Sequence, residues 1–256
     1  MGLLLIEGVV FVAASVAITV IVLLWSRPLI ARWVADEHNT VVGALFAAAG
    51  VVYAVVLAFV VFVVWAQWGA ADSSIVAEAA SMVSAYRATE VLPQPQQKQA
   101  QDGLRAFANN EIETEWSRTA TLKPHTTADN LNPVWAAFRT FQPTDPMPVA
   151  AEQDAIGRMS DLEEKQHMVH LAGEGTLPDV FWLVLLVGAV GTVAFSYVMA
   201  MENARVHAVA SGALAAMLAI LLFLVYALNF PFSGAVHVSQ QPIQHALLMF
   251  DEIDRH

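Results

Sequence analysis

The sequence contains no cysteine, and only 14% of its 256 residues are charged. Without cysteine the chain has no disulfide, no thiol nucleophile and no thiolate ligand for zinc or an iron–sulfur cluster. Charged residues make up about 25% of an average soluble domain, and apolar residues about 45–50%. At 57% hydrophobic residues, this chain is too apolar for such a domain. The composition therefore predicts a membrane protein.

Basic residues are also scarce, with 12 Lys and Arg against 23 Asp and Glu and a net charge of −11. Binding to nucleic acid needs clustered Lys and Arg, so nucleic acid is excluded as a partner. The sequence has no phosphate-binding loop, no glycine-rich dinucleotide fingerprint and no Gly-x-Ser-x-Gly elbow. We therefore predict that the protein is not an enzyme and has no catalytic residues and no cofactor.

Long apolar runs occur four times along the chain. Each is at least about 20 residues long, which is the length that a helix needs to cross a hydrocarbon core of about 30 Å. The runs are Leu3–Trp25, Val41–Ala66, Val180–Met201 and Ala208–Leu228. No alternation of apolar and polar residues indicates a strand, so the predicted fold class is all-α, with four transmembrane helices.

The four runs divide the chain into four segments. The first helix pair takes 1–66, an acidic helical extramembrane domain takes 67–179, the second helix pair takes 180–228, and an amphipathic tail takes 229–256. The tail is expected to lie on the membrane surface or against the extramembrane domain.

Helical spacing continues beyond the second run. Trp68, Ile75 and Met82 recur every seven residues, which predicts one helix that continues to Leu92 and stops before Pro93. Further helices are predicted around Leu104–Trp116, after Asn132-Pro133, and over Ala151–Ala172. Ser160-Asp161-Leu162-Glu163 fits a capping box, which predicts that the last of these helices restarts at Ser160.

The charge distribution favours one orientation in the membrane. The short connections 26–40 and 202–207 are neutral and carry three arginines, whereas 67–179 has a net charge of −8 and 229–256 of −2. Short loops with arginine remain cytoplasmic, so the acidic domain is predicted to be extracytoplasmic in a bacterial inner membrane. The inverted topology is the alternative.

Small residues follow one face of the second run at helical spacing. This small-residue seam consists of Gly43, Ala47, Gly50, Ala54 and Ala58. Such a seam predicts close helix packing or the lining of a pore. Phe59 and Phe62 are candidates for a hydrophobic constriction, and the alternative is that both face lipid.

Acidic residues flank the spans on the side of the extramembrane domain. They are Asp72, Glu78, Glu174 and Asp179. In an oligomer with a central axis they are expected to form an acidic vestibule that concentrates cations, and in a monomer they are a solvated rim. Glu7 lies inside the first span, where an acid faces a cavity or reaches the interface.

One group of possible metal ligands shares a helical face. Glu163, His167, His170 and Glu174 are spaced by four, three and four residues. The His-Glu-x-x-His order of zinc proteases is missing, and a polar helix face is the alternative that we prefer. No bound metal is predicted.

Several stretches resemble one membrane family. They are Asn39-Thr40-Val41-Val42-Gly43, the run from Gly50 to Phe59 that includes Tyr53, Tyr86-Arg87 with Leu92-Pro93, and Pro231-Phe232-Ser233-Gly234. Together with the layout of two spans, an insert and two spans, they are similar to the bestrophin-like domain proteins of bacteria and plants. The residues Asn39, Tyr53, Pro231, Phe232 and Gly234 carry the family motif.

The resemblance implies a function. Bestrophins are pentameric anion channels with four spans per subunit, so it implies a homo-oligomer, a pentamer, in the lipid bilayer, whose second span lines a path for small inorganic ions. The sequence lacks the acidic run that follows the corresponding turn of animal bestrophins, which speaks against calcium gating. Bestrophins also keep their large domain in the cytoplasm, opposite to the orientation that the arginines favour.

The function predicted is therefore an oligomeric ion channel. The acidic vestibule favours cations and the family resemblance favours anions. The alternative is a membrane-anchored scaffold or sensor with a helical extracytoplasmic domain.

Overall fold

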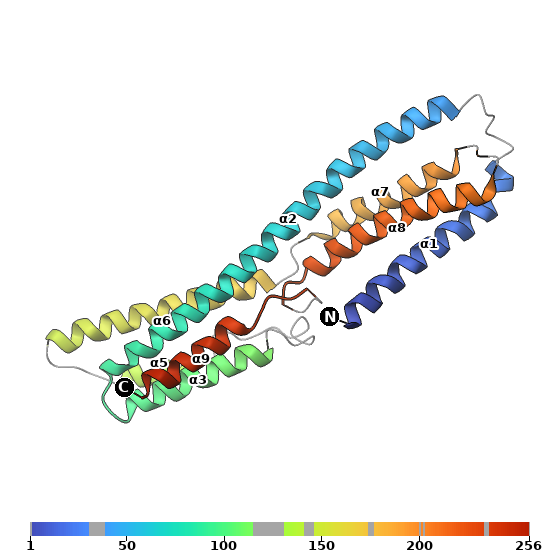
Figure 1. Cartoon of the computed structure of the whole chain (residues 1–256). Coiled ribbons are helices and arrows are strands. Elements are labelled where there is room, and N and C mark those ends of the chain that lie inside the picture. The colour runs from blue at the N-terminus through green and yellow to red at the C-terminus, as the bar shows by residue number, and fades with distance from the viewer. Residues whose placement is uncertain are drawn as a thin grey trace. The chain divides into compact units, whose positions relative to one another are not determined.

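The computed structural model describes residues 2–30, 39–114, 131–140, 146–173, 177–199, 201, 203–232 and 236–255. Within these ranges the secondary structure is helical, with no strand, and the predicted all-α fold class is confirmed. The chain divides into two units (Figure 1). The membrane unit comprises Met1–Ala66 and Thr176–Asn229, and the extramembrane unit comprises Gln67–Gly175 and Phe230–His256.

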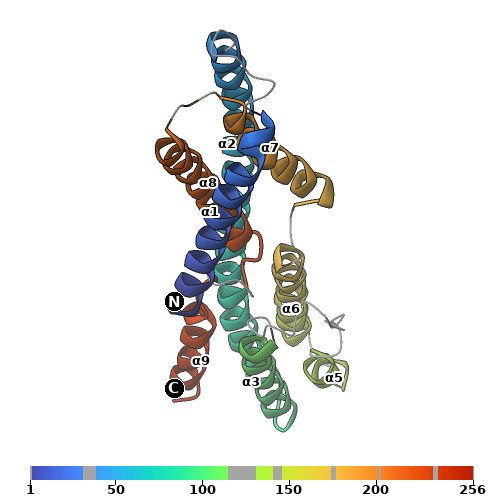
Figure 2. The same ribbon diagram turned by 90° about the vertical axis from the view of Figure 1, so that its right-hand side faces the viewer.

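The membrane unit contains the four described helices that are long and apolar enough to cross a membrane. They are α1 (Gly2–Ile30), the first part of α2 (Asn39–Ala88), α7 (Asp179–Tyr197) and α8 (Ala204–Leu228). Within this unit α1 and α7 run in one direction and α2 and α8 in the other (Figures 1 and 2). The most extensive helix contact in the unit joins α1 to α8.

Small residues and polar bonds hold α1, α7 and α8 together. Gly8 of α1 lies against the ring of Phe223, and Gly212 of α8 lies against Val16. The hydroxyl of Tyr197 donates to the carbonyl of Thr19 at 3.1 Å. Apolar side chains gain little by leaving lipid, so close approach and interhelical hydrogen bonds supply much of the association between membrane helices.

Tyr53 joins α2 to α7. Its side chain is buried, and its hydroxyl donates to the carbonyl oxygen of Leu185 at 2.8 Å. Its ring lies so close to Gly188 that a methyl group at that position would overlap the ring. Glycine at position 188 is therefore what lets the Tyr53 ring reach α7.

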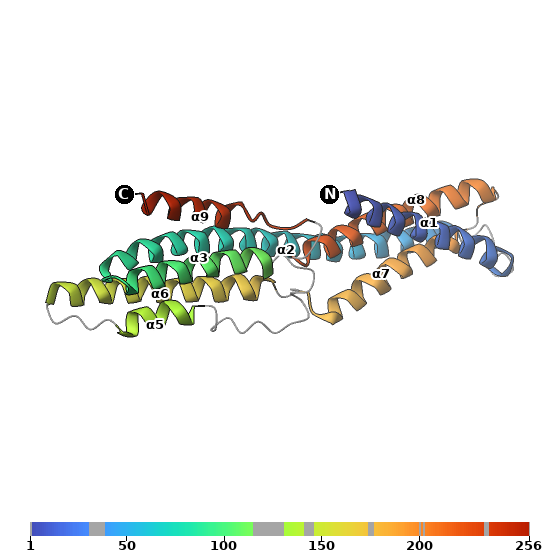
Figure 3. The same cartoon turned by 90° about the horizontal axis from the view of Figure 1, so that it is seen from below.

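In its described residues, the extramembrane unit is built from the end of α2 and five further elements. These are the 3₁₀ helix η2 (Thr89–Val91), α3 (Gln96–Thr114), α5 (Asn132–Thr140), α6 (Pro146–Gly173) and α9 (Gln241–Ile253). Within this unit α9 and α5 lie on opposite sides of the layer formed by α2, α3 and α6 (Figure 3). The core includes Ile75, Tyr86, Phe107, Met159 and Phe250, which come from α2, α3, α6 and α9.

The ends of these helices partly match the predictions. The α-helical part of α2 ends at Ala88, and η2 carries the chain to the extended residue Leu92 before Pro93. The predicted restart of a helix at Ser160 is wrong, because α6 is continuous. Its buried residues Ala155, Met159 and Leu162 keep helical register through this stretch, so packing holds it as one helix. The tail helix α9 packs into the core of the extramembrane unit.

The contact between Tyr53 and Gly188 gives a prediction with a built-in control. Overpacking of a tight contact costs about 1–3 kcal/mol, so Gly188→Ala is expected to lower the midpoint of thermal unfolding in detergent. Gly191, one turn further along α7, has open space where a methyl group would stand, so Gly191→Ala is expected to leave the midpoint unchanged or raise it slightly. Equal midpoints for the two variants would contradict the close approach of Tyr53.

Candidate functional site

The small-residue seam of α2 lines an open groove in the membrane unit. The groove has a volume of about 920 Å³, and Ala47, Gly50, Ala54 and Ala58 form part of one wall. Leu214, Leu218 and Leu221 of α8 stand on the opposite wall. A methyl group added to Gly50 would meet no atom within 4 Å, whereas one added to Gly43 would lie 4.0 Å from the terminal methyl of Met199. Most of the seam is thus not packed against any other helix that the structure describes.

Phe59 belongs to a different face of α2. Leu45, Val52, Val55 and Phe59 are all exposed, and none of them lines the groove. With 3.6 residues per turn, these four side chains fall within about 80° of one another around the helix axis, and the seam lies about 100–180° from Phe59. We call this second surface the Phe59 face. The seam and the Phe59 face cannot both point at one axis.

Phe62 stands between the two faces. It is exposed and lines the edge of the groove, about 60° around the helix from Phe59. If Phe59 faces a pore axis, Phe62 therefore does not point directly at that axis.

The acidic residues occupy different environments. Glu78 is fully buried in the extramembrane unit, Asp72 is half-buried on α2, and Asp179 is exposed at the start of α7. Glu7 is exposed on α1, and Glu174 lies outside the described residues. Among the described acids of the predicted vestibule, Asp72 and Asp179 are thus the two that reach a surface of the single chain.

The candidate metal ligands on α6 do not gather into a site. Across the described residues, no three His, Asp or Glu side chains are placed to hold one metal ion. Glu163 instead accepts a hydrogen bond from the indole nitrogen of Trp135, and His167 is exposed. Glu174, the fourth candidate, lies outside the described residues.

The motif residues have structural positions. Tyr53 makes the contact with α7, Pro231 and Phe232 are buried where the chain enters the extramembrane unit, and the backbone N–H of Val238 donates to the carbonyl of Pro231 at 2.8 Å. Asn39 begins α2, and Gly234 lies outside the described residues.

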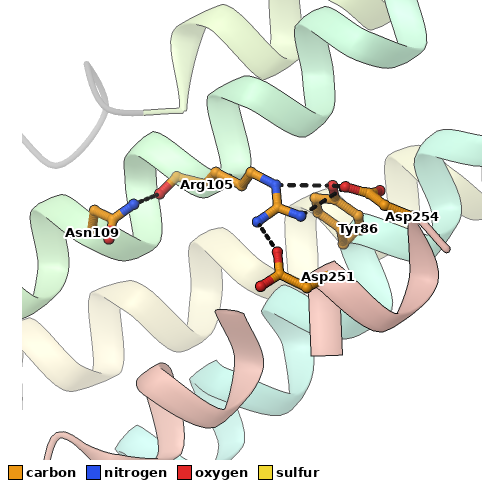
Figure 4. Close-up of polar contacts among 5 residues, drawn as sticks. All are labelled: Tyr86, Arg105, Asn109, Asp251 and Asp254. Atoms are coloured by element: carbon orange, nitrogen blue, oxygen red, sulfur yellow. Dashed lines mark hydrogen bonds and ion pairs between the residues drawn. The ribbon is translucent and has the colours of Figure 1, made fainter. Parts of the chain in front are cut away.

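The sequence analysis missed an ionic cluster that joins α2, α3 and α9 (Figure 4). The guanidinium of Arg105 donates from Nη1 to Asp251 and from Nη2 to Asp254, each at 2.7 Å. Its Nε donates to the hydroxyl of Tyr86 at 3.2 Å, and that hydroxyl donates in turn to Asp254 at 2.9 Å. The signal for this cluster was the spacing of Asp251 and Asp254, which puts two carboxylates on one face of α9.

Aromatic stacking reinforces this Arg105 cluster. The rings of Tyr86 and Phe250 are nearly parallel, with centroids 4.0 Å apart, and the guanidinium carbon lies 5.4 Å from the Tyr86 centroid. Burial is the largest of the causes that raise the pKa of Tyr86 to about 12, and the hydrogen bond to Asp254 is the second. The hydroxyl therefore stays protonated and donates to Asp254 at physiological pH.

The class of protein follows from these observations. It is an all-α membrane protein with two candidate spans on each side of a helical insert, and a C-terminal helix that returns to the insert. A family model described as Bestrophin-like domain matches residues 13–243, so the chain belongs to the bestrophin-like family. The predicted family resemblance is confirmed.

A solved structure has the same fold. The chain is similar to the crystal structure of a mutant bacterial bestrophin homolog from Klebsiella pneumoniae, with a TM-score of 0.53 and 16% sequence identity. The match covers 96% of this chain and 98% of that one. No curated protein matches the sequence.

The Arg105 cluster predicts how α9 is held. Hydrogen bonds to charged groups contribute about 1.5–3 kcal/mol when buried and less when exposed, so Arg105→Gln is expected to cost about 1–2 kcal/mol. The loss should show as faster hydrogen exchange at the amides of α9. Arg158→Gln removes an exposed ion pair within α6 and a hydrogen bond to Ser84 of α2, neither of which involves α9, and it should leave exchange in α9 unchanged. The same exchange rates in both variants would mean that apolar packing alone holds α9.

Proposed function

We propose that the protein is a homo-oligomeric ion channel in which α2 lines the central axis. The observation that carries the proposal is the Phe59 face, an apolar stripe along one span that no helix of the described chain covers. Membership of the bestrophin-like family supports the proposal, as does the similar fold of a solved bacterial bestrophin homolog.

The two faces of α2 suit two different tasks. Small side chains let a neighbouring helix approach closely, so the groove with Gly50 and Ala54 is where a neighbouring subunit would pack. Larger apolar side chains at an axis can narrow a pore and exclude water, and Val55 and Phe59 on the other face fit this role. We therefore propose Phe59, rather than the seam, as the constriction.

The burial of Glu78 changes the proposed vestibule. A fully buried carboxylate does not stand at a rim, and Asp72 lies about 140° around α2 from Phe59, so Asp179, together with Glu174, is left to form an acidic ring. The reversal potential of the purified protein in a planar bilayer under a potassium chloride gradient gives the sign of the permeant ion. A membrane-anchored scaffold would produce no current at all.

The native chain has no cysteine, so single cysteines can be placed without background. Cysteines at Val55 and Phe59 are expected to react with a charged, water-soluble thiol reagent and to lose current, because a pore-facing thiol meets water and forms the reactive thiolate. A cysteine at Ala54 is the matched control, and its current should persist because the seam packs against protein. Block at Ala54 but not at Phe59 would reverse the assignment of the two faces.

The size of Phe59 gives a second prediction. If its ring narrows the pore, Phe59→Ala should raise single-channel conductance. Phe46→Ala removes a ring that packs against Phe195, so it should lower stability without widening the pore.

The proposed oligomer gives a third prediction. Light scattering of the wild type in mild detergent should give a mass several times the 27.7 kDa of one chain. A monomer without current in liposomes would overturn the channel proposal.

A further inference from the structure

A second polar feature lies where the C-terminal ends of α2 and α9 meet. A pocket of about 410 Å³ is lined by Arg87 from α2 and by Met249, Glu252, Ile253 and Arg255 from α9 and its end. This volume falls in the range of about 300–1,000 Å³ in which small-molecule sites lie. Both arginine side chains are exposed, so a ligand can reach them from solvent.

The pocket has an excess of positive charge in an acidic chain. Neither Arg87 nor Arg255 forms an ion pair within the part of the chain that the structure describes. The two other carboxylates of this end of α9, Asp251 and Asp254, are already bound to Arg105. Glu252 is the single acid in the lining, against two guanidinium groups.

Helix dipoles explain part of this arrangement. The C-terminal end of a helix carries partial negative charge and favours a nearby cation, so one arginine at each helix end needs no ligand. The helix dipoles do not explain why Arg87 and Arg255 line the same pocket. They also do not explain the apolar wall that Met249 and Ile253 add to it. A pair of guanidinium groups beside an apolar wall matches an anion that carries an organic group.

We propose that this pocket binds a small organic phosphate. The planar fork of arginine donates two parallel hydrogen bonds to phosphate oxygens, and two such forks match a doubly charged phosphate group. Met249 and Ile253 would contact the organic part, and Glu252 would accept a hydrogen bond from a hydroxyl of the ligand. The ligand would bridge α2 and α9 and stabilise the docked position of α9. The site does not depend on the proposed ion conduction.

Calorimetric titration of the full-length protein in detergent tests the proposal, with inorganic phosphate and phenyl phosphate as probes. The wild type should bind phenyl phosphate more tightly than inorganic phosphate, because of the apolar wall. The double variant Arg87→Gln/Arg255→Gln should bind phenyl phosphate at least roughly tenfold more weakly, a loss of about 1.4 kcal/mol. Arg139→Gln on α5 removes one positive charge outside the pocket and should bind like the wild type.

Other results would overturn the site. Equal binding by the double variant and the wild type would show that the two arginines hold no ligand. Binding of dioctanoyl phosphatidylglycerol without binding of phenyl phosphate would assign the phosphate chemistry to a lipid headgroup instead of a soluble metabolite. Hydrogen exchange in α9 gives an independent readout, because phenyl phosphate should slow exchange there in the wild type and not in the double variant. Circular dichroism and gel filtration of each variant verify that it folds.

Discussion

Inside a lipid bilayer, no water is present to satisfy a backbone N–H or carbonyl group, and the structure of the membrane unit follows from this constraint. Its four spans are helices, and their polar side chains bond to backbone carbonyls. Thr192 donates to the carbonyl of Gly188 at 2.7 Å, and His207 bonds through Nε2 to the carbonyl of Ser196 at 2.9 Å. Because a carbonyl only accepts, Nε2 of His207 carries a proton. The hydroxyl of Tyr53 meets the same constraint and, in doing so, joins two spans.

The extramembrane unit obeys a different rule, since water surrounds it and apolar burial drives its packing. The second half of α2 shows this change. Up to Ala66 the helix is apolar around most of its circumference, and beyond it Ile75, Met82 and Tyr86 form one buried stripe. One continuous helix thus has a surface suited to lipid in its first part and a surface suited to water in its second part. The Arg105 cluster lies at the end of that stripe, where an ion pair can be half-exposed and still well hydrogen-bonded.

The parts of the fold that were predictable are those with local causes. Hydropathy located the spans because lipid makes an interrupted apolar run costly, and Pro93 marked the end of the long helix because proline cannot continue it. The capping box at Ser160 wrongly predicted a helix start, because its residues also fit the interior of a helix. The buried side chains of Met159 and Leu162 keep α6 continuous through this stretch. The partners Arg105 and Asp251 are 146 residues apart, so only the tertiary fold brings them together.

Phe59 and Tyr86 belong to the same helix, so a force on α9 at the Arg105 cluster is passed to α2 itself. Coupling of this kind needs an element with two arrangements, and between Phe59 and Tyr86 α2 contains a single glycine, Gly69. Gly69 has open space where a side chain would stand, and glycine weakens a helix by about 1 kcal/mol relative to alanine. Ser73 and Ser74 follow and bond back to the carbonyls of Gly69 and Ala70 at 2.8 and 2.9 Å, a pattern that often bends helices. An effect of α9 that travels along α2 to the Phe59 face therefore passes through residues 69–74, about a turn and a half of helix that contains Gly69 and both back-bonded serines.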